Sequence, residues 1–197
     1  MLIELKKIEN KDLETIRQWR INPDVSKYLY TDPQIIKEEQ KQWWVNKKDD
    51  EYFRIWLITV DGIKVGIYQI EKVDYRNKNV FWGYYIADKN LRGKGVGRSV
   101  ECSMYDYIFD VMGMHKACTE VFSWNRDVVA LHVRNGCMME GLFKEQVLKN
   151  GLFMDVIRLG LLHDDWIKVR KDIVFEKAVV DNFEEPCVMG NPFGNEE

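Results

Sequence analysis

The sequence predicts an α/β (α+β) protein in which one mixed, mainly antiparallel and twisted sheet of about seven strands is flanked by about four helices. Two predicted hairpins, with turns at Asp61-Gly62 and at residues 149–151, supply antiparallel strand pairs. Between them, residues 80–124 read as strand, loop, helix and strand, and such a crossover joins parallel strands. The 197 residues are enough for one domain with a buried core.

The N-terminal part of the chain predicts one strand and two helices. Residues 2–8 alternate weakly, which favours an opening strand. Asp12 is the predicted N-cap of a helix that ends before Pro23 and whose apolar face consists of Leu13, Ile16 and Trp19. A second helix is predicted over residues 31–48, with Asp32 as its N-cap and Pro33 in its first position.

The middle of the chain predicts three antiparallel strands, over residues 52–60, 63–73 and 80–87. Residues 90–100, with the sequence NLRGKGVGRSV, then form a glycine-rich loop that opens a helix. The apolar face of this helix consists of Val100, Met104, Ile108 and Val111, and Gly113 ends it.

The remaining elements complete one domain. They are a strand over residues 116–124, a short helix from Asn125 that Gly136 stops, and a hairpin over residues 142–162. We therefore predict a domain over residues 1–167 and a C-terminal extension over residues 168–197 that is partly a flexible acidic tail. Residues 181–197 hold five acidic residues and no Lys or Arg.

The composition excludes several classes of function. The formal net charge of −3 implies no nucleic-acid partner. No apolar run approaches the roughly 20 residues of a membrane helix, and the N-terminus lacks the apolar core of a signal peptide. We therefore expect a cytoplasmic protein with no membrane partner. The four cysteines and three histidines lack the spacing of metal ligands, so we expect reduced, mostly buried thiols and no metal.

The glycine-rich loop predicts a phosphate-binding site. The first N–H groups of a helix have no partner within the helix, and the helix dipole favours an anion there. Glycine lets the backbone approach a phosphate and adopt positive φ, and cationic side chains add charge-assisted hydrogen bonds. The alternative is a helix start that binds nothing, for which three closely spaced glycines would be an entropically costly choice.

Two common phosphate loops do not match this segment. No Gly-Lys-Ser/Thr ends it, as in a nucleotide-triphosphate loop, and Val100 stands where the last glycine of a dinucleotide fingerprint belongs. Residues 92–97 instead match Arg-x-x-Gly-x-Gly and resemble the acetyl-CoA pyrophosphate loop of the GNAT acetyltransferase family. The order of elements over residues 1–167 is also that of the family. The resemblance implies the GNAT fold and acetyl-CoA as co-substrate.

Longer segments, residues 19–25, 125–136 and 149–166, resemble the RimJ/RimL-type branch of the family. Within it, the chain is most similar to the sugar-nucleotide N-acetyltransferases of pseudaminic acid synthesis, which acetylate the amine of a UDP-linked amino-dideoxy sugar. This implies an N-acetyltransferase, a monomer or homodimer, that acts on a small amine, most directly a nucleotide sugar. Two alternatives stay open: a RimJ/RimL-type protein N-terminal acetyltransferase and a non-catalytic acyl-CoA-binding module.

The resemblance also implies which residues hold acetyl-CoA. In the family, the strand before the glycine loop splays from the next core strand, so the backbone of Tyr85 and Ile86 would hold the pantetheine and the thioester oxygen. Asn125 is a further candidate for coenzyme A contact, with plain helix capping as the alternative. The pyrophosphate would be held by Arg92, Gly93, Lys94, Gly95, Val96, Gly97 and Arg98.

Acetyl transfer to an amine needs a base for the amine proton and an acid for the departing thiolate. Glu120 is the candidate base, because a carboxylate in an apolar strand is costly unless it is paired or functional. Its alternatives are a bridge to an arginine or contact with water. His132 occupies the position of the Tyr that protonates the thiolate in many GNATs, so it is the second catalytic candidate. It could act as acid, base or hydrogen-bond partner.

The substrate candidates come from the first two helices and the last hairpin. Arg20, like Arg17 and Arg54, could meet a diphosphate, although charges on helices usually form a solvated face. Trp43 and Trp44 are candidates to stack on a uracil or sugar, with core packing as the alternative. Asp155 would lie beside the site in the family's arrangement, with a structural acceptor role as its alternative.

Overall fold

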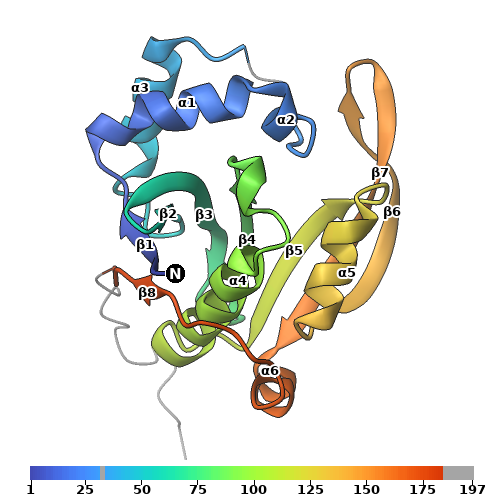
Figure 1. The fold of residues 1–197 in the computed structure, drawn as a ribbon. Coiled ribbons are helices and arrows are strands. Elements are labelled where there is room, and N and C mark those ends of the chain that lie inside the picture. Colours follow the sequence, from blue (N-terminus) through green and yellow to red (C-terminus); the bar gives the residue numbers. More distant parts are fainter. Residues whose placement is uncertain (32–33, 184–197) are drawn as a thin grey trace, which may run out of the picture.

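The computed structural model describes residues 1–31 and 34–183, and it confirms the predicted fold class (Figure 1). Eight strands form one sheet in the order β6-β7-β5-β4-β3-β2-β1-β8. The strands are β1 (Ile3–Lys7), β2 (Arg54–Val60), β3 (Ile63–Asp74), β4 (Asn79–Ile86), β5 (Lys116–Phe122), β6 (Met138–Lys149), β7 (Leu152–Leu162) and β8 (Val179–Val180). The α-helices are α1 (Leu13–Ile21), α2 (Pro23–Ser26), α3 (Lys37–Lys47), α4 (Val96–Asp106), α5 (Arg126–Arg134) and α6 (His163–Arg170).

The sheet is mainly antiparallel, and each of its faces carries its own hydrophobic core. The β4–β5 and β1–β8 pairs are parallel, and the other five pairs are antiparallel. Side chains alternate along β2, so Trp56 joins the core shared with Val100 of α4, whereas Leu57 joins the core shared with Ile16 of α1. Helices therefore cover both faces, with α4 on one side and α1 on the other (Figure 1).

The parallel strands β4 and β5 separate part-way along their length. They pair at Asn79↔Lys116, Val80↔Ala117 and Phe81↔Cys118, although β4 continues to Ile86 and β5 to Phe122. On its other side, β4 remains paired with β3 as far as Ile86. In the described residues, the edge of β4 from Trp82 onward therefore faces β5 without a strand partner. A gap with unpaired backbone groups opens directly before the glycine-rich loop.

The described part of the C-terminal extension is docked on the sheet. The sequence did not predict α6 and β8. α6 crosses the predicted boundary at residue 167, and β8 lies within the extension and pairs with the edge of β1. Trp56 Nε1 donates to the Asp181 carbonyl at 2.8 Å, and the ring of Phe183 packs against Trp56 at 5.0 Å between centroids. The predicted acidic tail beyond residue 183 lies outside the described residues, and the domain boundary at residue 167 stays a prediction.

The second helix begins later than predicted. α3 starts at Lys37, where Glu39 accepts the N–H of Ile36 at 3.0 Å. The predicted cap residues, Asp32 and Pro33, lie outside the described residues. None of the helices in the described ranges combines the length and the apolar character needed to span a membrane.

Gly66 of β3 fixes the path of β4 at the gap. A Cβ built on Gly66 would lie 2.0 Å from the carbonyl oxygen of Tyr85, so Gly66→Ala must displace the β4 backbone. We expect it to lower the free energy of unfolding by about 2 kcal/mol, as overpacking does. Gly83→Ala is the matched control, because a Cβ at Gly83 on β4 meets no atom within 4 Å. Urea unfolding of both variants checks this, and equal stabilities would contradict it.

Candidate active site

The glycine-rich loop opens α4, as predicted. Gly95 is the N-cap of α4, with φ of +85°, and Gly93 has φ of +74°. These values lie in the left-handed region that side chains other than glycine adopt with strain. A Cβ on Gly97 would lie 3.0 Å from Tyr84 Oη, so this glycine allows α4 to approach β4 closely. Glycine is therefore required at Gly93 and Gly95 by the backbone conformation and at Gly97 by close packing.

Most backbone N–H groups of this loop are free to bind a ligand. Between Gly93 and Arg98, only Lys94 donates its backbone N–H within the described residues, to the Leu91 carbonyl at 3.3 Å. The first helical bond of α4 runs from the Ser99 N–H to the Gly95 carbonyl at 3.0 Å. The cationic side chains of the loop form no ion pair in the described part of the chain.

A pocket of about 350 Å³ lies against this loop and is lined by Lys94, Gly95, Arg98 and Ser99. It is also lined by Met1 and by residues 174–176 of the C-terminal extension. The free amides at the helix N-terminus and the unpaired cations fit a diphosphate, and the gap between β4 and β5, which precedes the loop in the chain, fits an extended arm. Coenzyme A has both parts.

A family model described as an acetyltransferase (GNAT) domain matches residues 3–138, which is more than half of the chain. The chain belongs to the GNAT acetyltransferase family. It is an acetyl-CoA-dependent N-acetyltransferase, which confirms the predicted reaction.

Two relatives and one solved structure show what this acetyltransferase is similar to. Spermidine N(1)-acetyltransferase of Vibrio cholerae is 24% identical over 167 residues, or 84% of this chain and 95% of the relative. Acetyltransferase PseH of Campylobacter jejuni is 27% identical over 137 residues, or 68% of this chain and 83% of the relative. A crystal structure of the Vibrio cholerae spermidine enzyme in complex with CoA and spermine has a TM-score of 0.79, at 22% identity over 84% of this chain and 98% of that one. That structural likeness shows the fold alone.

The candidate base of the acetyltransferase, Glu120, is an ion-pair partner in the structure. Arg158 of β7 lies opposite it in register and donates Nε and Nη2 to its Oε1, at 3.0 and 2.9 Å. Tyr30 donates its hydroxyl to Oε2 at 3.0 Å, and burial followed by the Glu120 charge raises the pKa of Tyr30. The arginine bridge weighed as an alternative is therefore present. Because the side chain of Glu120 is still 20% exposed, a role as base stays a prediction.

The other catalytic candidate, His132, is almost completely buried on the opposite side of the sheet from Glu120. Its Nδ1 lies 2.9 Å from Glu101 Oε2, and its ring packs edge-on against Trp82 at 5.0 Å between centroids. Trp82 belongs to the core on the α4 face, whereas Glu120 is reached by Tyr30 from the α1–α3 segment. The two candidates thus lie on opposite faces of the sheet, one on each face at the gap between β4 and β5.

The cofactor and substrate candidates fall into two groups. Tyr85, Ile86 and Asn125 remain available: the first two lie on the unpaired edge of β4, and the side chain of Asn125 makes no cap hydrogen bond although it is the N-cap of α5. Asp155 is engaged, because it accepts the Glu145 N–H at 2.8 Å and Lys144 Nζ at 3.0 Å. Those hydrogen bonds lower the pKa of Asp155 and support an irregular segment of β6.

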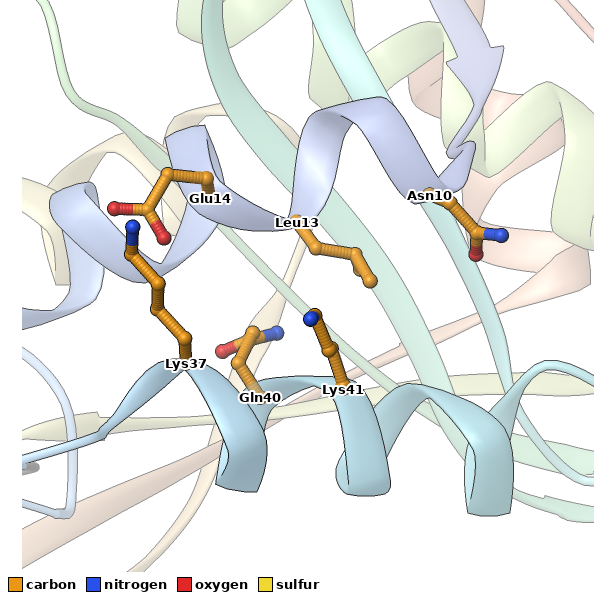
Figure 2. A pocket seen from close by; sticks show the side chains of 6 residues that line it. All are labelled: Asn10, Leu13, Glu14, Lys37, Gln40 and Lys41. Atoms are coloured by element: carbon orange, nitrogen blue, oxygen red, sulfur yellow. The ribbon is translucent and has the colours of Figure 1, made fainter.

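The two tryptophans of α3 pack rather than stand free. Trp43 lies edge-on to Phe53 at 5.9 Å between centroids, and Trp44 Nε1 donates to Asn10 Oδ1 at 3.0 Å. A pocket of about 260 Å³ between α1 and α3 is shown in Figure 2, and none of the predicted site residues lines it. Its lining residues are Asn10, Leu13, Glu14, Lys37, Gln40 and Lys41.

The three described cysteines are buried thiols, and Cys137 Sγ lies 3.1 Å from the Tyr105 hydroxyl. Cys102, Cys118 and Cys137 are free and buried, as predicted, and burial raises the pKa of each thiol, that of Cys102 to about 12. Cys187 lies outside the described residues. Among the residues that the structure describes, no three His, Cys, Asp or Glu side chains gather as metal ligands.

Proposed function

We propose that the acceptor is the amino group of an anionic, nucleotide-linked sugar, most directly a UDP-linked amino-dideoxy sugar as in pseudaminic acid-type pathways. The observation that carries this proposal is Arg20 of α1. Its guanidinium is largely buried, and burial lowers its pKa, yet it forms no hydrogen bond or ion pair within the described residues. A desolvated cation is costly unless an anion pairs with it.

The surroundings of Arg20 support an acceptor site. Its charge acts on Tyr85, whose hydroxyl is buried and has no hydrogen-bond partner in the described part of the chain. Trp19, next to Arg20, packs edge-on against Tyr85 at 6.3 Å between centroids. Tyr85 lies on the part of β4 that no longer pairs with β5, so a diphosphate at Arg20 would hold its sugar near the gap.

The same charge argues against a polyamine acceptor. Spermidine is a polycation, and Arg20 would repel it unless an acidic group intervened. Similarity to the relative named for spermidine therefore does not by itself make a polyamine the expected acceptor. A protein N-terminal acetyltransferase remains the alternative that the acceptor experiment below distinguishes.

The roles of the residues follow from the reaction. A C–N bond forms, the thioester C–S bond breaks, and one proton passes from nitrogen to sulfur. Glu120 would take the amine proton on one side of the gap, and His132 would serve the departing sulfur on the other. The loop from Arg92 to Arg98 would hold the diphosphate of coenzyme A, and the free edge of β4 would donate to the thioester oxygen.

Arg20→Met should raise the KM for the nucleotide sugar about 10-fold, the loss of about 1.4 kcal/mol of binding, and leave the KM for acetyl-CoA unchanged. Arg17→Met is the matched control on the same helix, because Arg17 is held by Glu14 at 2.8 Å. Steady-state kinetics with both substrates checks this. Equal effects of the two variants would show that Arg20 does not meet the acceptor.

The acceptor class is tested by incubating the protein with acetyl-CoA and a mixture of UDP-amino sugars, spermidine and peptides with free N-termini. We expect release of coenzyme A thiol and, by mass spectrometry, an acetylated UDP-amino sugar. Acetylated spermidine or peptide as the main product would overturn the proposed acceptor while leaving the N-acetyltransferase activity intact.

A further inference from the structure

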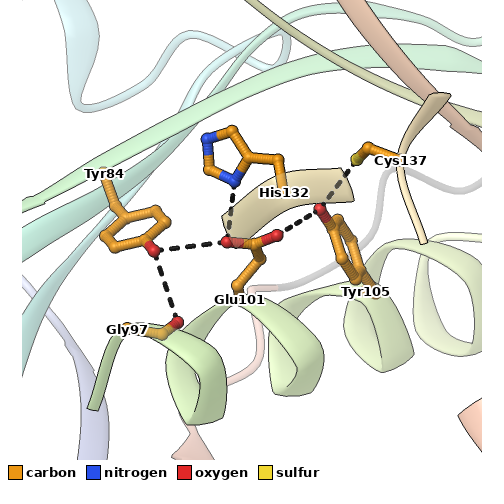
Figure 3. Close-up of polar contacts among 6 residues, drawn as sticks. All are labelled: Tyr84, Gly97, Glu101, Tyr105, His132 and Cys137. Atoms are coloured by element: carbon orange, nitrogen blue, oxygen red, sulfur yellow. Dashed lines mark hydrogen bonds and ion pairs between the residues drawn. The ribbon is translucent and has the colours of Figure 1, made fainter. Parts of the chain in front are cut away.

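Glu101, in the middle of α4, is the centre of a buried polar cluster that the sequence did not reveal (Figure 3). The residue is 0% exposed. Tyr105 donates its hydroxyl to Oε1 at 2.8 Å, and Tyr84 donates its hydroxyl to Oε2 at 3.2 Å. His132 Nδ1 lies 2.9 Å from the same Oε2. The cluster thus connects β4, α4 and α5, the three elements around the acetyl-CoA site.

Among these partners, His132 is the one that can compensate the negative charge of Glu101. A buried carboxylate needs a compensating cation or several hydrogen bonds. Within residues 1–31 and 34–183, no Lys or Arg forms an ion pair with Glu101, and His132 is the single ionisable base in contact with it. An ionised carboxylate only accepts hydrogen bonds, so it requires the proton of the imidazole on Nδ1.

Asp106, five residues further along α4, has its charge compensated in a different way. It is also a buried carboxylate, but Arg170 Nε donates to its Oδ1 at 2.9 Å and Trp166 Nε1 donates to the same atom at 3.0 Å. Asp106 is therefore fixed by a permanent cation of α6. Glu101 instead faces the His132 ring, which is not a permanent cation.

We propose that Glu101 is a positioning residue for His132: it holds the ring with its proton on Nδ1 and so leaves Nε2 as the atom that exchanges a proton with the reacting sulfur. The inference rests on the role of His132 in the proposed function. Figure 3 shows Nε2 turned away from Glu101. Nε2 has no hydrogen-bond partner in the described residues. It is also not one of the polar atoms there that are fully buried without a partner, so it keeps some exposure.

In this arrangement every proton that His132 gives to the sulfur is replaced by one from the amine. With Glu101 ionised, the protonated ring carries N–H groups on both nitrogens, and Nε2 gives its proton to the departing thiolate as the C–S bond breaks. The neutral ring keeps its Nδ1 proton on Glu101. The proton released by the newly acylated nitrogen, passed through Glu120 or water, restores the Nε2 proton. Glu101 itself gains or loses nothing.

The kinetic test is a double-mutant cycle between Glu101→Gln and His132→Asn. We expect Glu101→Gln to lower kcat about 10-fold or more in the native chain, with little change in the KM for acetyl-CoA. In the His132→Asn background it should lower kcat less than about twofold, because the two residues act as one unit. Asp106→Asn is the control: it removes a buried carboxylate of the same helix and should leave kcat within about twofold.

Each other outcome has a definite meaning. If Glu101→Gln lowers kcat equally in both backgrounds, Glu101 is structural and the inference is overturned. If His132→Asn is slow but Glu101→Gln is not, the inference alone fails. If His132→Asn has native kcat, the role of His132 in the proposed function fails as well.

A second measurement needs neither turnover nor a variant of Glu101 that folds. The ¹⁵N chemical shifts of the histidine rings, with His132 assigned from its loss in His132→Asn, report which nitrogen carries the proton. We expect His132 to carry a proton on Nδ1 across the pH range in which the protein is folded. A neutral ring with its proton on Nε2 would overturn the inference.

Discussion

Gly95→Glu is expected to weaken the binding of coenzyme A about 100-fold or more. Gly95 is the N-cap of α4 with φ of +85°, and its own N–H and those of the next three residues are free of backbone partners in the described part of the chain. A carboxylate there would repel the diphosphate and strain the backbone that presents these N–H groups. A 100-fold loss corresponds to about 2.7 kcal/mol, the range of a charge-assisted contact. Calorimetric titration with coenzyme A measures it.

Gly62→Glu separates loss of the phosphate site from backbone strain. Gly62 lies in the β2–β3 turn with φ of +80°, and, as at Gly95, a Cβ there would meet no atom within 4 Å. Both variants should therefore lose a similar free energy of unfolding, of about 1 kcal/mol. Only Gly95→Glu should lose affinity for coenzyme A. Unchanged affinity in Gly95→Glu would remove the loop from the acetyl-CoA site.

The elements that the sequence predicts well are those with local causes. The Asp61-Gly62 turn, with φ of +50° and +80°, fixes the β2–β3 hairpin from two adjacent residues. The start of α4 is likewise set by glycines within the loop itself. β8 could not be predicted in this way, because a strand of two residues has no periodicity and forms only by pairing with β1.

The site was predicted less completely because its contacts cross long distances in sequence. The apolar residues around Glu120 predicted a carboxylate within a strand, but its pairing with Arg158 depends on the register between β5 and β7. Glu101 lies four residues after Gly97 and four before Tyr105, a spacing that puts an acidic residue on a helix face shared with the phosphate loop. Its histidine partner, 31 residues away on α5, follows only from how the helices pack.

Glu120→Gln is expected to lower kcat about 100-fold while the affinity for acetyl-CoA changes less than about twofold. The amide keeps the size of the side chain and can still accept the Tyr30 hydroxyl, but it cannot take a proton from the amine. The deficit should shrink as pH rises, because more of the acceptor amine is then unprotonated before it binds. Rates of the variant and of the native chain, measured from about pH 6 to pH 10, test both the loss of kcat and its dependence on pH. These limits lie roughly on either side of the pKa of an amine.

Loss of the Arg158 ion pair is the competing explanation for such a deficit, and Glu140→Gln controls for it. Glu140 of β6 pairs with Lys116 at 2.6 Å, and its side chain is 34% exposed against 20% for Glu120. Both variants remove a partly exposed carboxylate that is paired across neighbouring parts of the sheet, and such pairs contribute about 1 kcal/mol or less. If Glu120→Gln retains native kcat, or if its deficit does not depend on pH, Glu120 is a structural partner of Arg158 and Tyr30, and the amine must lose its proton to solvent or to another group.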